Sequence, residues 1–417
     1  MQRTLIAIKP LAMLGFCLAV AGFELLTYMA SDMLMPAMLD VTAEFDAAAH
    51  HVANAFNLYL LGGVCVQWLV GPLADRYGRR PLLLTGSALF ALACALAAGT
   101  TSIEAFNLMR LLQGMGLGYV VAVSYPALQE VFCEADAVRL MALLGNVALL
   151  SPLLGPLLGS LLLQYLDWRE LFLALALVAV AVWLALYLCT PETVGVARHD
   201  GQVMAAVAFS GRQLLRRYRA LLGNRRFLAA SLALGLMGLP LIAWIGVAPL
   251  LLIELLGMTP VEYGLWQIPL FSAVICGNLL LDRLLLTHAL PQLIRLALWP
   301  FSLGLLSLIG VALLNAALGP LMAGLALYAL GLGLSNAALY RMALFASDDS
   351  KGLVSASIGM ISIAVMAAGG SLIAALGAGA KLQSFALLAA LGGLLALPLL
   401  LSFLRSQPTA HALPPSP

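Results

Sequence analysis

Charged residues are scarce in this chain of 417 residues: Asp, Glu, Lys and Arg make up 10% of it, whereas hydrophobic residues make up 63%. Soluble domains carry roughly 25% charged and about 45–50% apolar residues. So little polar surface cannot cover so large an apolar interior in water. The composition therefore excludes an ordinary soluble domain and predicts an integral membrane protein whose solvent is the lipid bilayer.

Other absences narrow the function. The six cysteines are scattered singly, without a CxxC pair or a His/Cys cluster, so neither a metal site nor a disulfide framework is indicated. The formal net charge is only +2, and no nucleic-acid-binding motif is present. HExxH, GxSxG and P-loop patterns are missing as well, which argues against a membrane enzyme and an ATP-driven pump. We expect no enzyme activity, no metal, no cofactor and no nucleic-acid partner.

Long apolar runs recur along the whole chain, each near the roughly 20 residues that a helix needs to cross the hydrocarbon. The first could pass for a secretory signal, since Arg3 and Lys9 precede LAMLGFCL. Because the pattern continues downstream, an uncleaved helix explains it better. The twelve predicted spans are 11–36, 52–74, 81–99, 104–128, 138–164, 169–189, 227–254, 262–286, 292–315, 320–344, 352–377 and 382–404.

The longest polar stretch separates the sixth span from the seventh. This spacing predicts an N-terminal six-helix bundle over 1–189, a linker over 190–226, a C-terminal six-helix bundle over 227–405 and a disordered tail over 406–417. If the N-terminus is cytoplasmic, every Lys and Arg except Arg110, Arg169 and Lys381 falls on the cytoplasmic side. The positive-inside rule thus predicts that both termini and the linker are cytoplasmic.

The linker contains the basic string RQLLRRYRALLGNRR, residues 212–226. One interpretation is an amphipathic helix that lies on the anionic inner leaflet. The other is a simple topology anchor, whose arginines only keep the linker in the cytoplasm. The sequence leaves both open.

Two carboxylates interrupt the first apolar run, FELLTYMASDMLMP, at Glu24 and Asp32. A charge at mid-membrane costs about 2.5–3.5 kcal/mol on insertion scales, so such residues face the interior of the bundle. Eight residues along a helix span about 12 Å with a turn of roughly 80°, so both side chains can line one cavity. Lost hydration favours a protonated carboxyl, whereas an entering cation favours the ionised form. We therefore predict that these two acids exchange protons for substrate.

Arg110, in FNLMRLLQGMG, lies farther from the ends of its predicted span than any other basic residue in a span. Arginine stays protonated in proteins and needs partners. Glu24, Asp32 and backbone carbonyls are candidates, and Gln113 can share its hydrogen bonds. The alternative is that Arg110 only pins the fourth helix in place.

Two further sequence motifs occur in the first half. In the loop GPLADRYGRRP after the second span, Gly71 lets helix ends approach closely and Gly78 permits a tight reversal. Asp75 can cap a neighbouring helix or pair with Arg76 or Arg79. The loop therefore predicts a polar latch that one conformation makes and another breaks. SPLLGPLLGS in the fifth span combines interrupted hydrogen bonding with a small-xxx-small face, and indicates either a hinge or a static kink. The latch residues are Gly71, Asp75, Arg76, Gly78, Arg79 and Arg80, and the hinge residues are Pro152, Gly155, Pro156 and Gly159.

These strings, together with Arg110, Gln113, Gly114 and DWRELF at the start of the sixth span, resemble the signatures of the major facilitator superfamily, and the likeness is closest to its drug/proton antiporters. The resemblance covers essentially all twelve spans. It implies two six-helix bundles around a central cavity, with Tyr28, Ser31, Phe56 and Ala148 around the substrate. It further implies a monomeric proton-driven exporter of lipophilic cationic and neutral drugs in the bacterial inner membrane. A symporter or a dedicated single-substrate exporter is the alternative.

Overall fold

The structure, a computed structural model, is helical in the part of the chain that it describes. It describes residues 4–199, 201, 203–204, 211–285, 287–347 and 351–405. Within these ranges the side chains of 121, 134–135, 138–139, 141–143, 145–149 and 351–352 lie outside the description, as does the predicted tail 406–417. Eleven helical spans of the described residues are long and apolar enough to cross a membrane. The prediction of an all-α integral membrane protein is confirmed.

The first half holds α1 to α8. They are α1 (Pro10–Asp32), α2 (Met38–Glu44), α3 (His50–Tyr77), α4 (Arg79–Ala98), α5 (Ile103–Tyr119), α6 (Tyr125–Val131), α7 (Glu134–Leu162) and α8 (Trp168–Cys189). A 3-10 turn, Met35–Ala37, joins α1 to α2, so the first span continues past the predicted end at residue 36 and reaches Glu44. The π-helical turn Val120–Ser124 joins α5 to α6. Together with α7, the eleven spans match the twelve that were predicted.

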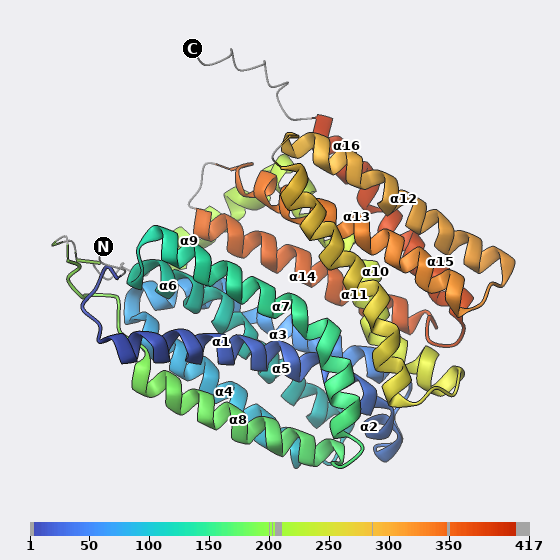
Figure 1. Ribbon diagram of the computed structural model, residues 1–417, viewed down its shortest axis with the longest axis horizontal. Helices are drawn as coiled ribbons and strands as arrows, with labels where there is room; N and C mark the ends of the chain where they lie inside the picture. The colour runs from blue at the N-terminus through green and yellow to red at the C-terminus, as the bar shows by residue number, and fades with distance from the viewer. Residues whose placement is uncertain are drawn as a thin grey trace.

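The second half follows the helix α9 (Gly211–Leu222). It holds α10 (Arg225–Pro249), which a π-helical stretch extends to Leu255, then α11 (Pro260–Leu284), α12 (Leu290–Leu314), α13 (Leu318–Leu344), α14 (Lys351–Ala375), α15 (Leu382–Leu394) and α16 (Ala396–Arg405). Figure 1 shows α1–α8 (blue to green) gathered on one side of the molecule and the second-half helices (yellow to red) on the other. In the same view α9 lies toward the end of the bundle where α1 begins.

Within each half, glycines let helices approach to backbone contact. A Cβ placed on Gly114 in α5 would overlap the carbonyl oxygen of Tyr59 in α3, and one on Gly333 in α13 would overlap that of Val274 in α11. Helices in lipid gain little from the hydrophobic effect, so close van der Waals contact of this kind holds them together. The same device therefore joins the second helix of each half to the fourth.

Three contacts between the halves lie near the end of the bundle opposite α9. The Asn57 amide in α3 donates to the Ser371 hydroxyl in α14 at 3.1 Å. The Ser160 hydroxyl near the end of α7 donates to the carbonyl of Pro260 at the start of α11 at 2.6 Å. A Cβ on Gly246 near the end of α10 would lie 3.1 Å from Ala53 in α3. At this end, therefore, the two halves are closely packed.

The glycine contacts predict a stability effect that a matched pair of variants can isolate. We expect Gly114→Ala to destabilise the protein by roughly 1–3 kcal/mol, because the new methyl group must displace the α3 backbone at Tyr59. Gly310→Ala is the control, since no atom would lie within 4 Å of its Cβ in α12. The measurement is the thermal midpoint of the full chain in detergent, followed by size-exclusion chromatography. Equal midpoints for the two variants would contradict the packing argument.

Candidate functional site

The first transmembrane helix turns both acids away from lipid. Glu24 is 0% exposed and Asp32 4% exposed. On α1, the residues that face outward are leucines at helical spacing, and Leu11 at the start of the helix is 83% exposed. The exposed leucines and the two acids thus occupy different faces of α1. The leucines face lipid, and both carboxylates face the interior of the bundle.

Glu24 is held by a tyrosine that sequence analysis missed. The Tyr125 hydroxyl donates to Glu24 Oε1 at 2.7 Å, and Glu24 Oε2 has no partner among the described residues. Tyr125 is the first residue of α6, directly after the π-helical turn Val120–Ser124. A π-turn adds a residue to the helix and rotates the face that the next turns present, and such turns are frequent at functional sites. The position of Tyr125 depends on that turn, which no local sequence signal marks.

Asp32 sits against the predicted hinge. Its Oδ2 accepts a hydrogen bond from the Ser151 hydroxyl in α7 at 2.7 Å. A Cβ on Gly155 would lie 2.5 Å from the Asp32 Cβ, and one on Gly159 would overlap the Met33 carbonyl. Pro152 and Pro156 lie inside α7, which continues through both. The small face of α7 thus packs on the end of α1 that carries Asp32. Ser151 opens the quoted string, but its contact with Asp32 needed the structure.

The structure describes the side chains of three of the four other residues that were predicted to line the cavity. Tyr28, one turn from each acid on α1, is within electrostatic range of both. Ser31 is buried and its hydroxyl has no partner among the described residues, and Phe56 is buried in α3. Tyr263 of α11, which sequence analysis missed, is buried and within electrostatic range of Asp32. The side chain of Ala148 lies outside the described residues.

Arg110 in α5 is completely buried. Its Nη1 donates to Gln113 Oε1 at 2.7 Å and to the Ala30 carbonyl at 3.4 Å. Its Cζ lies 4.6 Å from the centroid of the Tyr59 ring, a cation–π geometry. Among the described residues neither Glu24 nor Asp32 forms an ion pair with it, although Asp32 is within its electrostatic range. Of its expected partners, Arg110 therefore binds the Gln113 side chain and a backbone carbonyl.

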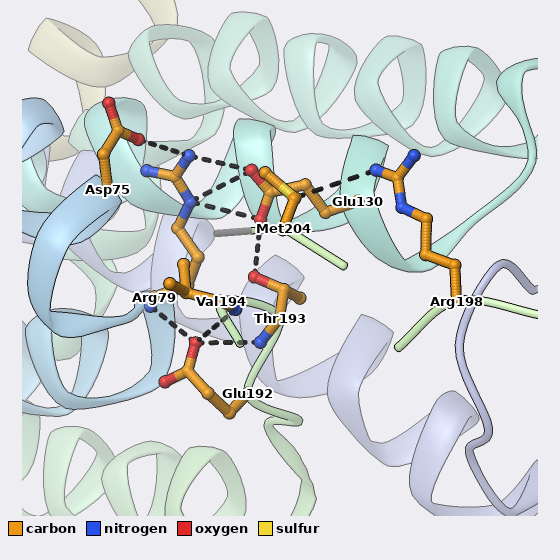
Figure 2. Close-up of polar contacts among 8 residues, drawn as sticks. All are labelled: Asp75, Arg79, Glu130, Glu192, Thr193, Val194, Arg198 and Met204. Carbon is orange, nitrogen blue, oxygen red and sulfur yellow. Dashed lines mark hydrogen bonds and ion pairs between the residues drawn. The ribbon is translucent and has the colours of Figure 1, made fainter. Parts of the chain in front are cut away.

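The predicted latch is part of a larger polar network (Figure 2). Asp75 pairs with Arg79 Nη2 at 2.6 Å, and the same nitrogen lies 2.8 Å from Glu130 Oε1 in α6. Arg79 Nε also donates to both oxygens of Glu130 at 3.2 Å, so two nitrogens of the guanidinium bind this carboxylate. The Thr193 hydroxyl, just after α8, donates to Glu130 Oε2 at 2.5 Å. Glu130 and Thr193 were both missed by sequence analysis, because their partners lie far along the chain.

Glu192, also missed, caps the start of α4. Its Oε1 accepts from the backbone N–H of Arg79 at 2.9 Å and from those of Thr193 and Val194 at 2.8 and 3.0 Å. Free N–H groups and the helix dipole favour a negative charge at a helix N-terminus. Asp75 was one predicted candidate for that role, and it pairs with Arg79 instead. The carboxylate that caps α4 therefore comes from the linker after α8.

The other latch residues have simpler positions. Gly78 has a φ of +105°, which permits the reversal between α3 and α4, and a Cβ there would also overlap Glu192. The Arg80 Nη2 donates to the Tyr187 carbonyl at 2.7 Å, and the Arg76 guanidinium lies 5.2 Å from the Tyr77 ring. At Gly71 no atom would lie within 4 Å of a Cβ, so the expected close approach is not made there.

The sequence matches a known protein family and curated relatives along most of its length. The major facilitator superfamily profile matches residues 20–351. Multidrug transporter MdfA of Yersinia pestis bv. Antiqua (strain Angola) is 42% identical over 398 residues, which is 95% of this chain and 95% of that protein. Multidrug transporter MdfA of Edwardsiella ictaluri (strain 93-146) is 41% identical, covering 94% of each chain.

Solved structures show the same fold at low sequence identity. A D-xylose-proton symporter superposes with a TM-score of 0.73 at 14% identity, over 93% of this chain and 97% of that chain. A bacterial homologue of the human lysosomal transporter Spinster, inward-facing and unoccupied, superposes with a TM-score of 0.72 at 12% identity, over 96% and 98%. The twelve helices in two bundles, the profile match and these relatives agree: the chain is a membrane transporter, not an enzyme, and belongs to the major facilitator superfamily.

Proposed function

We propose that this protein is a proton-driven multidrug antiporter that exports lipophilic cationic and neutral drugs by alternating access. The observation that carries the proposal is the burial of Glu24 and Asp32 on one helix, where each accepts a hydrogen bond from a hydroxyl of another helix. The name of the relatives, Multidrug transporter MdfA, supports the drug class. An apolar site with few charges is permissive toward varied lipophilic compounds.

The exchange follows from the cost of a buried charge. With both acids protonated, neither carboxyl carries a charge that needs a counter-ion. A cationic drug that enters stabilises the ionised carboxylate, so a proton leaves, and a returning proton weakens the hold on the drug in the same way. Tyr125 and Ser151 orient the two carboxyls, and the unpartnered Glu24 Oε2 is left for proton or substrate.

Alternating access requires the contacts between the halves to break and re-form. The two halves rock about the site, so the drug reaches it from one side of the membrane at a time. Contacts such as Asn57–Ser371 and Ser160–Pro260 close one end in the conformation described. We place both termini and α9 in the cytoplasm and the protein in the bacterial inner membrane, acting as a monomer. The closed end then faces away from the cytoplasm.

We assign the latch a conformational role and the hinge a packing role. Asp75 is bound to Arg79 with its side chain 43% exposed, so the contact can be made and broken at low cost. Glu130 holds the Arg79 side chain in place, and Glu192 holds the start of α4. Gly155 and Gly159 let α7 slide against α1 next to Asp32, so a movement of α7 changes the surroundings of that acid.

The proton coupling predicts the behaviour of charge-neutralising variants. We expect Glu24→Gln and Asp32→Asn each to slow proton-driven efflux of a lipophilic cation at least ~10-fold, because each removes a buried titrating group. The measurement uses proteoliposomes loaded with a cationic dye and an acidified outer medium, with dye release followed by fluorescence. Asp40→Asn, at an exposed acid in α2, is the matched control. Full efflux by the double Glu24/Asp32 variant would refute the assignment.

The direction of movement separates antiport from the alternatives. When the outer medium is acidified, an antiporter expels preloaded cation from the vesicles, whereas a proton symporter accumulates it. A dedicated exporter would expel one compound only, so the assay is run with several unrelated lipophilic cations and neutral drugs. We expect expulsion of more than one of them by the wild-type chain. Accumulation, or transport restricted to a single compound, would establish the alternative in its place.

The polar network predicts that Glu130 contributes to stability, whereas Asp75 contributes mainly to transport. We expect Glu130→Gln to lower the thermal midpoint strongly, because breaking one partner of a buried ion pair costs about 3–5 kcal/mol. Asp75→Asn removes a half-exposed partner worth about 0–1 kcal/mol, so the midpoint should stay near that of the wild type. The transport rate of Asp75→Asn should nevertheless fall. A wild-type rate for this variant, measured in the same vesicles, would remove the latch role.

A further inference from the structure

The α9 helix carries a concentration of positive charge that nothing in its own segment balances. Residues 201–253 contain no Asp or Glu, whereas 212–226 contain six arginines. Four of them lie on α9 itself and are exposed: Arg212, Arg216, Arg217 and Arg219. Within the described part of the chain none of these four forms an ion pair with a carboxylate.

The same helix has an apolar stripe that the protein covers only in part. Leu214, Leu215, Tyr218, Leu221 and Leu222 recur at the spacing of one helical face. Leu221 is buried, but Leu215 is 59% exposed and Leu222 is 48% exposed. Exposed leucines flanked by arginines are the pattern of a helix that lies in the boundary between headgroups and acyl chains.

The surroundings of α9 continue the lipid-facing surface. The Tyr218 hydroxyl donates to the Trp68 carbonyl in α3 at 3.2 Å, and the Trp68 side chain is itself exposed. At its other end α9 leads, through Gly223 and the helix cap Asn224, into the transmembrane helix α10. The helix thus touches the first half, leads directly into the second, and lies beside side chains that face lipid.

We propose that α9 is a binding surface for anionic phospholipid headgroups of the leaflet at its end of the bundle. Its exposed leucines enter the boundary of the acyl chains, and its arginines bind the phosphates. Charge complementarity and continuity with the lipid-facing surface favour lipid over a soluble partner. Because α9 bridges the two halves, the bound lipid holds the linker across their ends and makes the transport rate depend on the anionic lipid content.

The test compares three forms of the full chain by native mass spectrometry, titrated with phosphatidylglycerol or phosphatidylcholine. One variant replaces Arg212, Arg216, Arg217 and Arg219 with Gln, and the matched control replaces the same four with Lys. We expect the Gln variant to lose affinity for phosphatidylglycerol at least ~10-fold, since each basic residue near the surface contributes separately. The Lys variant should stay within about twofold of the wild type, because it keeps the charge. Affinity for phosphatidylcholine should not change.

A second variant keeps the test decisive if the Gln variant does not fold. Leu215→Ser retains every arginine and changes an exposed side chain, and it should weaken phosphatidylglycerol binding without changing the thermal midpoint. Wild-type affinity in the Gln or Ser variant would overturn the proposal. An equal loss in the Gln and Lys variants would do so too, because it would assign the arginines a structural role. The readout needs no transported drug, so it stands or falls separately from the antiport function.

Discussion

The site depends on the cost of placing a carboxylate where water is scarce. Glu24 and Asp32 are buried at 0% and 4% exposure, and among the described residues each accepts a hydrogen bond from one hydroxyl and forms no ion pair. A hydroxyl orients a carboxylate without neutralising it, so the cost of the charged form persists. That uncompensated cost is the quantity that we propose a proton or a cationic drug relieves in turn. Burial on the inner face of α1 comes first, and the functions assigned to α6 and α7 depend on it.

The same chain also buries a carboxylate in the opposite way. Glu130 is 7% exposed, but Arg79 binds it through two nitrogens and the Thr193 hydroxyl donates to it as well. A pair so fully satisfied is costly to break, so we assign it a structural role. Burial alone thus does not distinguish an exchange site from a structural one. The number and charge of the partners does.

Sequence reasoning reached the features that depend on neighbours along the chain. Apolar runs predicted the spans, Gly78 predicted the turn, and Asp75 with Arg79 is a pair four residues apart. It missed Tyr125, Ser151, Glu130 and Glu192, whose partners lie 50 or more positions away and meet only when helices pack. It also ended the first span at Pro36, where a 3-10 turn in fact carries the chain on to Glu44. Proline is tolerated at the start of such a turn because the missing N–H is not needed there.

The two halves share the same close helix contacts but differ in their buried charges. Gly114 and Gly333 bring equivalent helix pairs into contact, yet the buried charges of the described residues all lie in the first half. In the second half the buried polar side chains are neutral, and the Trp244 indole N–H donates to Gln267 at 2.8 Å. A neutral half can move against a charged one without carrying any ion through lipid. We infer that this asymmetry confines the proposed proton step to the first half, because Glu24 and Asp32 both lie buried on α1 there.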